Sequence, residues 1–261
     1  MPVRVEPGSR GIVFATTGPV YTAFARRAAH TVRGVMPDVP IDLFTDQDVA
    51  DPVFDQVHAV KEIWFRPKIE AIRRTRFERS LFLDSDVMVL RDVSEAFDIL
   101  DRCDLAAAVA RARMRVMMRP EDGVPRSFPP VNSGVLAIRA PDRIEQFSLD
   151  WEAGVRQAGA EVDQGVLRSL LYHGDLAFLP LGEEYNLVHI QALESWTPEH
   201  GALRILHVRD LHERPPGDPN RPYSLEEAIG PVLARKIETL PRTEDDTGSV
   251  RFELANAIRV Q

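Results

Sequence analysis

Two aspartates, Asp84 and Asp86, interrupt an otherwise apolar stretch of the sequence. Residues 81–83 are apolar and run into the pair, and residues 87–90 are apolar and follow it. This is the pattern of a buried strand interrupted by charge, and buried carboxylates are costly unless a cation or hydrogen bonds satisfy them. In extended chain, residues two apart point to the same side. Two hard oxygen ligands on one side suit Mg²⁺ or Mn²⁺, which in turn would hold a phosphate or diphosphate.

The same spacing also arises without a metal. An acidic loop between two strands explains Asp84 and Asp86 by themselves, and residues 46–48 (Asp-Gln-Asp) repeat the spacing at what we expect to be an ordinary strand-ending turn. The elements that carry the first pair, and the other polar motifs around it, therefore decide between a metal site and an acidic loop.

The composition is that of a soluble globular protein. The 261 residues are 44% hydrophobic and 28% charged, with a formal net charge of −8. This acidic balance disfavours a nucleic-acid partner. The chain is long enough for one domain with a large core. Lysine occurs only at positions 61, 68 and 236, so 32 − 3 = 29 of the basic residues are arginine, and we interpret this bias as that of a GC-rich, bacterial genome.

The sequence favours a cytoplasmic location. Cys103 is the only cysteine, which excludes an intrachain disulfide and fits a reducing compartment. The N-terminal residues include no apolar segment typical of a signal peptide. No apolar run approaches the ~20 residues that a membrane-spanning helix needs, so we expect no transmembrane segment.

Strand-like and helix-like segments alternate in the N-terminal part of the chain. We expect strands over 11–16, 41–45, 56–60 and 81–83, and helices over 19–34 and 67–79. Such alternation predicts an α/β protein with a mostly parallel sheet. In these sheets ligands bind beyond the carboxyl ends of the strands. Asp84 and Asp86 directly follow a strand, so we expect them at that edge.

The rest of the chain continues the pattern less regularly. Residues 111–130 are rich in Arg, Met and Pro and predict a long loop over the sheet edge. The other expected elements are strands over 105–110, 131–139, 177–179 and 203–207, helices over 141–158, 163–172 and 224–240, and a tail from residue 241 in which 252–260 could form one more short element.

Polar motifs follow the carboxylate pair in a fixed order. They are Asn132-Ser133-Gly134, Asp163-Gln164, Tyr185-Asn186 and His207. Each has an ordinary structural explanation when taken singly: a turn, a helix N-cap, a loop, and a histidine satisfied within the core.

Taken together, these motifs resemble those of nucleotide-diphospho-sugar transferases with the GT-A fold. The likeness is greatest to the retaining glycosyltransferase family 8, which includes glycogenin and bacterial galactosyltransferases of lipopolysaccharide synthesis, and it covers about residues 11–210. The resemblance implies a Rossmann-like mixed, mostly parallel sheet flanked by helices. It implies one GT-A domain over 1–240, with a nucleotide-binding half at about 11–110, an acceptor and sugar half at about 111–240, and a tail at 241–261.

The resemblance also implies the reaction and the metal. It implies transfer of a hexosyl group from a nucleotide-diphospho-sugar donor, such as a UDP-sugar, with retention of configuration. Asp84, Asp86 and His207 would bind Mn²⁺ or Mg²⁺, and the imidazole favours Mn²⁺. The acceptor, whether glycan, small molecule or protein, would be selected by loops at 111–130 and 182–199. An oligomer is compatible with the sequence.

The remaining candidates would surround the donor. Lys68 lies about one helix before the aspartates and would face the diphosphate or the sugar. Asp163 or Gln164 would stabilise the oxocarbenium-like centre. The other donor-binding residues implied by the resemblance are Thr16, Thr17 and Tyr21 at the base and ribose, Ser85 at the ribose, and Asn132, Ser133 and Gly134 at the sugar.

The chain departs from the family pattern at two places. Thr16-Thr17-Gly18 stands where the family commonly has an Asp or Asn after the first strand. The family's His-x-x-Gly-x-x-Lys phosphate loop is here His207-Val-Arg-Asp-Leu-His-Glu213, without the glycine and the lysine. Arg209 or Arg214 could take the place of that lysine, since arginine is an apt phosphate ligand.

Three other classes remain as alternatives. Residues 81–87 also resemble the first motif of haloacid-dehalogenase-like phosphatases, with Lys236 and Asp245-Asp246 as imitations of the later motifs. A sugar-nucleotide pyrophosphorylase would need a glycine-rich, arginine-containing loop after the first strand, which this chain lacks. A degenerate transferase would bind nucleotide-sugar without turnover. Metal-dependent hydrolysis of a nucleotide-sugar would distinguish an enzyme from such a binding protein.

Overall fold

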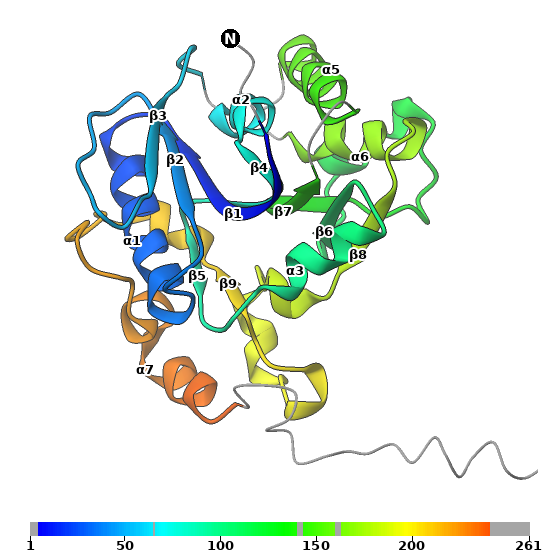
Figure 1. Cartoon of the computed structure of the whole chain (residues 1–261). Helices are drawn as coiled ribbons and strands as arrows, with labels where there is room; N and C mark the ends of the chain where they lie inside the picture. The colour runs from blue at the N-terminus through cyan, green and yellow to red at the C-terminus, as the bar shows by residue number, and fades with distance from the viewer. Residues whose placement is uncertain (1–4, 65, 140–142, 160–162, 241–261) are drawn as a thin grey trace, which may run out of the picture.

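The computed structural model describes residues 5–64, 66–139, 143–159 and 163–240. Its central sheet is built from strands β1 (Glu6–Thr16), β2 (Ile41–Thr45), β3 (Gln56–Ala59), β4 (Phe77–Leu83), β6 (Leu105–Val109), β7 (Val131–Arg139) and β8 (Phe178–Leu181). Their order across the sheet is β3-β2-β1-β4-β7-β6-β8 (Figure 1).

The sheet is mixed but mostly parallel, as the sequence predicts. Strands β3, β2, β1 and β4 pair in parallel, and β6 pairs in parallel with β8. Only β7 runs against its neighbours β4 and β6. Helix α1 (Pro19–Val35) connects β1 to β2, as expected for parallel neighbours, which need a crossover connection.

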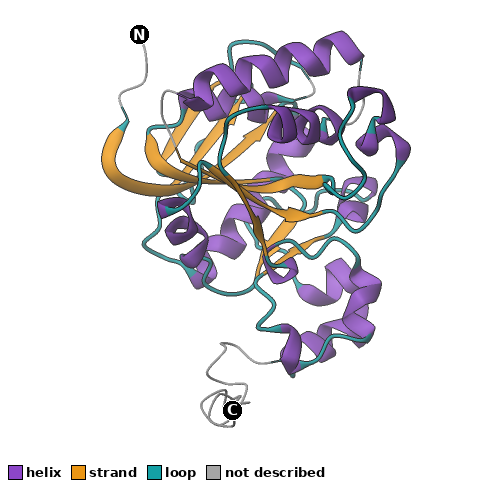
Figure 2. Cartoon of the chain, turned by 90° about the vertical axis from the view of Figure 1, so that its right-hand side faces the viewer, coloured by secondary structure: helices purple, strands orange, loops and turns teal. Residues whose placement is uncertain are grey.

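Helices cover both faces of the sheet (Figure 2). Helix α1 packs on the face that receives Ile12 and Leu81, whereas α2 (Pro67–Arg74), α5 (Arg143–Ala158) and α6 (Gln164–His173) pack on the face that receives Val13 and Phe82. Successive side chains of a strand point to opposite faces. Because both faces are buried, these strands are continuously apolar rather than alternating.

A second, two-stranded sheet brings distant parts of the chain together. Strand β5 (Val87–Val89) follows the aspartate pair and pairs antiparallel with β9 (Ile205–His207), with Val87 opposite His207. The remaining elements are α3 (Glu95–Asp98), α4 (Arg115–Met118), α7 (Leu225–Glu238) and short 3₁₀ segments at Ile99–Asp101, Pro120–Asp122, Glu183–Tyr185, Ile190–Glu194, Pro198–His200 and Arg209–Glu213.

Helix α2 is shorter than its sequence predicts. We expected it to reach residue 79, but it ends at Arg74 and β4 begins at Phe77. Thr75 has an extended backbone, and its hydroxyl contacts Ser80 Oγ at 2.9 Å and accepts from Phe77 N at 3.3 Å. Burial of Phe77 in the core favours the strand, so tertiary packing overrides the helical pattern. The expected start of the next helix at 141, the tail and the element at 252–260 lie outside the described residues.

The predicted loop at 111–130 is ordered along α6 and includes the short helix α4. The fully buried side chain of Arg168, on α6, donates hydrogen bonds to this loop. Its acceptors are the main-chain carbonyls of Met118, Val124, Pro125 and Phe128, at 2.7 to 3.4 Å. A single arginine therefore ties this loop to the helix that begins at Asp163-Gln164.

Candidate active site

A pocket of about 790 Å³ opens where β1 and β4 end. It collects side chains from eight separate segments of the chain, including both halves of the expected domain. The sequence-predicted residues on its wall are Thr16, Thr17, Tyr21, Lys68, Asp84, Ser85, Asp86, Asn132, Ser133, Asp163, Gln164, His207 and Arg209. Three residues that the sequence pointed to are not on the wall, namely Gly134, Tyr185 and Arg214.

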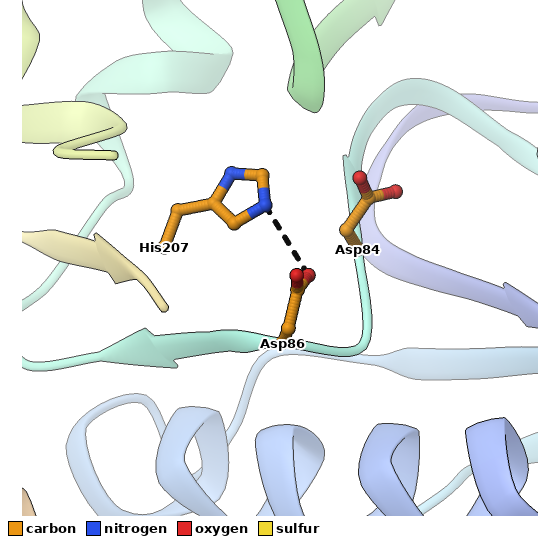
Figure 3. Close-up of side chains that lie close together, drawn as sticks. All are labelled: Asp84, Asp86 and His207. Atoms are coloured by element: carbon orange, nitrogen blue, oxygen red, sulfur yellow. Dashed lines mark ion pairs between the residues drawn. The ribbon is translucent and has the colours of Figure 1, made fainter. Parts of the chain in front are cut away.

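His207 and Asp86 point toward each other, and Asp84 lies beside them (Figure 3). The aspartates lie in the turn between β4 and β5, and His207 ends β9 directly opposite that turn. One ligand atom from each residue lies within 4.8 Å of the other two. The β5–β9 pairing is what brings the imidazole to the carboxylates.

The environment of Asp86 fits a divalent cation. Asp86 is buried, with 5% of its side chain exposed. His207 Nε2 lies 3.3 Å from Asp86 Oδ1, and His212 Nδ1 lies 3.5 Å from Oδ2. Among the described residues, the 3.3 Å approach of His207 Nε2 is the only polar side-chain contact of Oδ1, and its geometry is poor for a hydrogen bond. A buried oxygen of this kind is costly unless a cation satisfies it, and the oxygen and imidazole donors are those that Mn²⁺ and Mg²⁺ sites use.

The two buried groups stabilise each other's charged form. Burial raises the pKa of Asp86, but the charge and hydrogen bonding of His207, followed by the charge of His212, outweigh it and hold the pKa well below its usual range. Burial lowers the pKa of His207, but Asp86 outweighs this and raises it. The carboxylate is therefore ionised and ready to bind a cation.

Lys68 connects the aspartate pair to β7. Its Nζ donates to Asp84 Oδ1 and to the carbonyl of Ser133, both at 2.5 Å. The main-chain N–H of Asp84 donates to the carbonyl of Gly134 at 2.8 Å. Lys68 is 7% exposed, and its ammonium links the turn that carries Asp84 to strand β7.

Asp163 faces the pocket and makes no helix-capping contact. It is the N-cap of α6, but its side chain accepts no cap hydrogen bond. Its carboxylate instead accepts from Ser133 Oγ, 3.3 Å from Oδ2, and Arg66 Nε lies 3.5 Å from the same oxygen. Trp151 Nε1 donates to the Asp163 carbonyl at 3.2 Å. The explanation of Asp163 as a side-chain helix cap is therefore not supported.

The end of the pocket expected to hold the base is less polar than the sequence implies. The Thr16 hydroxyl lies 3.0 Å from the hydroxyl of Thr22 on α1, so it is used inside the protein. Thr17 Oγ donates to the Trp64 carbonyl at 3.4 Å. Tyr21 is 48% exposed and contacts the His212 ring edge-on. These positions leave an aromatic edge and the main chain to contact a ligand.

Arg66 and His212 are among the pocket residues that the sequence did not single out. Arg66 precedes the helix that carries Lys68. His212 follows His207 in the loop that departs from the family pattern, and its Nε2 lies 3.2 Å from Ser85 Oγ. The only signal for His212 was a second histidine in that loop. Tyr185 of the Tyr185-Asn186 motif lies outside the pocket wall, and its hydroxyl donates to Glu95 at 2.8 Å.

The second aspartate pair is an ordinary turn, as expected. Asp46 follows β2, and its Oδ1 accepts from the Gly18 N–H at 2.7 Å, which fixes the start of α1. Asp48 is exposed. Neither residue is on the pocket wall, so the same Asp-x-Asp spacing has a different role there.

Gly134 lies behind His207 and makes room for the imidazole. A Cβ atom built at this position would lie 2.2 Å from His207 Cε1 and 2.9 Å from Asn132 Oδ1. Real Cβ atoms essentially never approach so closely, so any side chain would displace the histidine. The structure therefore gives this glycine a packing role behind the His207 side chain.

Gly134→Ala is expected to lower metal affinity and to destabilise the fold by about 1–3 kcal/mol, the usual cost of overpacking a core. Gly34→Ala is the matched control, because Gly34 is exposed near the end of α1 and a Cβ there meets nothing within 4 Å. That substitution should stabilise the protein by about 0.5–1 kcal/mol. Thermal denaturation and Mn²⁺ titration of both variants measure this. A stable Gly134→Ala variant with unchanged metal affinity would contradict the packing argument.

Comparison with solved structures identifies the fold. The galactosyltransferase LgtC, solved with donor and acceptor sugar analogues, aligns with a TM-score of 0.55 at 15% identity over 87% of this chain and 94% of that one. The chain has the GT-A glycosyltransferase fold. The glycosyltransferase GlyE of Streptococcus pneumoniae aligns at 0.54 and 21% identity over 76% of this chain, and mouse xyloside xylosyltransferase 1 aligns at 0.50 and 13% identity over 79% of it.

This chain spans 55% of the length of the GlyE chain and 100% of the xylosyltransferase chain. No protein-family model and no curated protein sequence matches it. The predicted GT-A fold, with its mixed and mostly parallel sheet, is confirmed. Within the described residues, no helix is both long and apolar enough to cross a membrane.

The fold also bears on the phosphatase alternative. Lys236 would have to reach the aspartate pair, but it lies on α7 and its Nζ donates to the Glu194 carbonyl at 2.5 Å. It is not on the pocket wall, and Asp245-Asp246 lie outside the described residues. The haloacid-dehalogenase interpretation therefore lacks its lysine, and the GT-A fold argues against it.

Proposed function

We propose that this protein is a metal-dependent glycosyltransferase, which moves a hexosyl group from a nucleotide-diphospho-sugar, a UDP-sugar, to a hydroxyl of an acceptor. One observation carries the proposal: Asp84, Asp86 and His207, from two distant segments, meet at the edge of a GT-A sheet. Lys68 and Asp163 line the same pocket. Its volume of about 790 Å³ lies within the range of typical ligand pockets.

Asp84, Asp86 and His207 would hold Mn²⁺, or Mg²⁺, through carboxylate oxygens and Nε2. When bound, the cation supplies Lewis-acid stabilisation of the departing diphosphate. Lys68 supports the same charge from the other side, since its ammonium lies at Asp84 and the Ser133 carbonyl. Arg209, on the pocket wall, replaces the lysine of the family loop as a second contact to phosphate.

Asp163 acts at the sugar in this proposal. The bond between the anomeric carbon and the diphosphate oxygen breaks, and the acceptor oxygen forms the new bond from the same face. The acceptor proton leaves on the departing diphosphate oxygen. Positive charge develops on the sugar ring, and the Asp163 carboxylate, held by Ser133 and Arg66, stabilises it. Gln164 and Asn132 contact the sugar hydroxyls, and configuration is retained.

The base and the acceptor occupy opposite ends of the pocket. Thr17, Tyr21 and the main chain at Ser85 meet the base and ribose. The acceptor enters beside residues 111–130, where Arg111 pairs with Glu183 across the rim. Its class, whether glycan, small molecule or protein, is set by this rim.

Divalent metal and nucleoside diphosphate are expected to bind together and only weakly apart. The aspartates need a cation, and the cation needs phosphate oxygens to fill its coordination shell. Calorimetry should therefore show UDP binding with Mn²⁺ present and a large loss of affinity with EDTA. GDP is the control for the base. Equal UDP affinity with and without metal would contradict the assignment of the aspartate pair.

One alternative keeps the site and removes the turnover. The His207 loop departs from the family pattern, which would suit a protein that binds nucleotide-sugar without transferring it. Metal-dependent hydrolysis of a UDP-sugar panel distinguishes the two: slow release of sugar that requires Mn²⁺ supports the enzyme, whereas tight binding without release supports the degenerate transferase.

A further inference from the structure

Three buried polar side chains form a connected row behind the metal-ligating atom of His207. His207 Nδ1 lies 3.0 Å from Asn186 Oδ1. Asn186 Nδ2 lies 2.9 Å from Asn132 Oδ1, and the Gly134 main-chain N–H donates to that oxygen at 2.8 Å. His207, Asn186 and Asn132 are 5%, 3% and 8% exposed. Bulk water is therefore a poor substitute for any of these contacts.

The direction of every hydrogen bond in the row follows from its last member. A main-chain N–H can only donate, so the Asn132 atom that faces Gly134 is the oxygen. That oxygen also faces Asn186, so Asn186 presents its NH₂ group to Asn132. The amide of Asn186 must then present its oxygen to His207. An amide oxygen only accepts, so His207 carries a proton on Nδ1.

The consequence concerns the other imidazole nitrogen. With the proton held on Nδ1, the neutral ring presents a lone pair on Nε2, and Nε2 is the nitrogen that faces Asp86. We propose that Asn186, oriented through Asn132 by the Gly134 main chain, is a positioning residue that holds His207 in the tautomer and orientation needed to bind the divalent cation. This inference rests on the proposed metal site.

The arrangement has the chemistry of an outer ligand shell. Histidines that bind metals donate their second N–H to a carbonyl or carboxylate, which fixes the ring and its tautomer. Here the acceptor is the amide oxygen of Asn186, which ends a short 3₁₀ segment. The next residue, Leu187, donates its N–H to the Ile205 carbonyl and accepts from the His207 N–H. The main-chain hydrogen bonds between Leu187 and the strand that ends at His207 therefore fix the position of Asn186 relative to His207.

Mn²⁺ titration at saturating UDP tests the proposal without any turnover, since metal and nucleoside diphosphate are expected to bind together. Asn186→Leu removes both polar atoms with little change of volume, and it should weaken Mn²⁺ binding about 10- to 100-fold, as loss of outer-shell partners does. Binding is read from the electron paramagnetic resonance signal of free Mn²⁺ and from calorimetry. Tyr185→Phe is the matched control in the same turn, since the Tyr185 hydroxyl bonds to Glu95, and it should bind Mn²⁺ like wild type.

The outcomes separate this inference from the proposed function. Unchanged Mn²⁺ affinity in a folded Asn186→Leu variant would overturn the positioning role and leave the metal site standing. Absence of Mn²⁺ binding to wild type with UDP present would overturn both. Loss of Mn²⁺ affinity in Asn186→Leu but not in Tyr185→Phe supports both the positioning role and the metal site.

A second measurement uses the wild-type protein and remains decisive if Asn186→Leu does not fold. In Zn²⁺-loaded protein labelled with ¹⁵N-histidine, the His207 signals, assigned by comparison with His207→Gln, should show the proton on Nδ1 and the metal on Nε2. A proton on Nε2 with the metal on Nδ1 would overturn the proposal.

Discussion

Asp86→Ala is expected to abolish sugar transfer, whereas Asp48→Ala leaves it intact. Both residues end an Asp-x-Asp sequence, so the comparison separates the motif from its surroundings. Asp86 is buried, and its two carboxylate oxygens face His207 and His212 at 3.3 and 3.5 Å. Loss of this carboxylate removes a cation ligand and several kcal/mol of transition-state stabilisation. The measurement is kcat/KM for transfer from a UDP-sugar with Mn²⁺.

The folded state of the Asp86 variant needs its own measurement. Removing the carboxylate leaves His207 buried without its charge partner, and breaking a buried ion pair is destabilising in general. Thermal denaturation should therefore accompany the kinetics, so that inactivity is attributed only to a folded protein. Similar activities of folded Asp86→Ala and Asp48→Ala would mean that the wrong aspartate pair has been assigned to the metal.

Asp163→Asn is expected to lower kcat by about 10²–10³-fold, with little change in the affinity for UDP and Mn²⁺. A loss of this size is typical when one preorganised electrostatic group is removed from an active site. The carboxylate lies on the pocket wall, at the end proposed to hold the sugar, and Ser133 and Arg66 contact it. Its main effect should appear as charge develops on the sugar, so kcat falls and ground-state binding does not.

Asparagine is the sharpest replacement at this position. It keeps the shape and can still accept from Ser133 Oγ, but it removes the negative charge. The structure shows no side-chain capping bond from Asp163, so stability should change little. Gln164→Ala serves as a neighbouring comparison and should cost less, since it removes no charge. Near-normal turnover of Asp163→Asn with its true donor would assign the charge stabilisation to another residue.

The sequence alone determined the fold class and the location of most candidate residues. Apolar runs that end in polar residues predicted strands with functional side chains at their carboxyl ends, and this local pattern placed Asp84 and Asp86 at the sheet edge. Such predictions succeed because a strand that is buried on both faces of a sheet must be apolar at consecutive positions, which is visible in the sequence. The ordered motifs then predicted the GT-A fold, which the structure confirms.

Only the tertiary structure decided which residues contact one another. His207 reaches Asp86 through the pairing of β5 with β9, and the row from His207 to Gly134 joins three separate segments. Such contacts depend on non-local strand pairing, which no local pattern encodes. Non-local contacts also give the two Asp-x-Asp sequences different roles: Asp46 accepts from the N–H of Gly18 at the start of α1, whereas Asp84 lines the pocket. The helix predicted over 67–79 ends at Arg74 in the structure for a related reason. Burial of Phe77 in the core outweighs the helical pattern of residues 75–79.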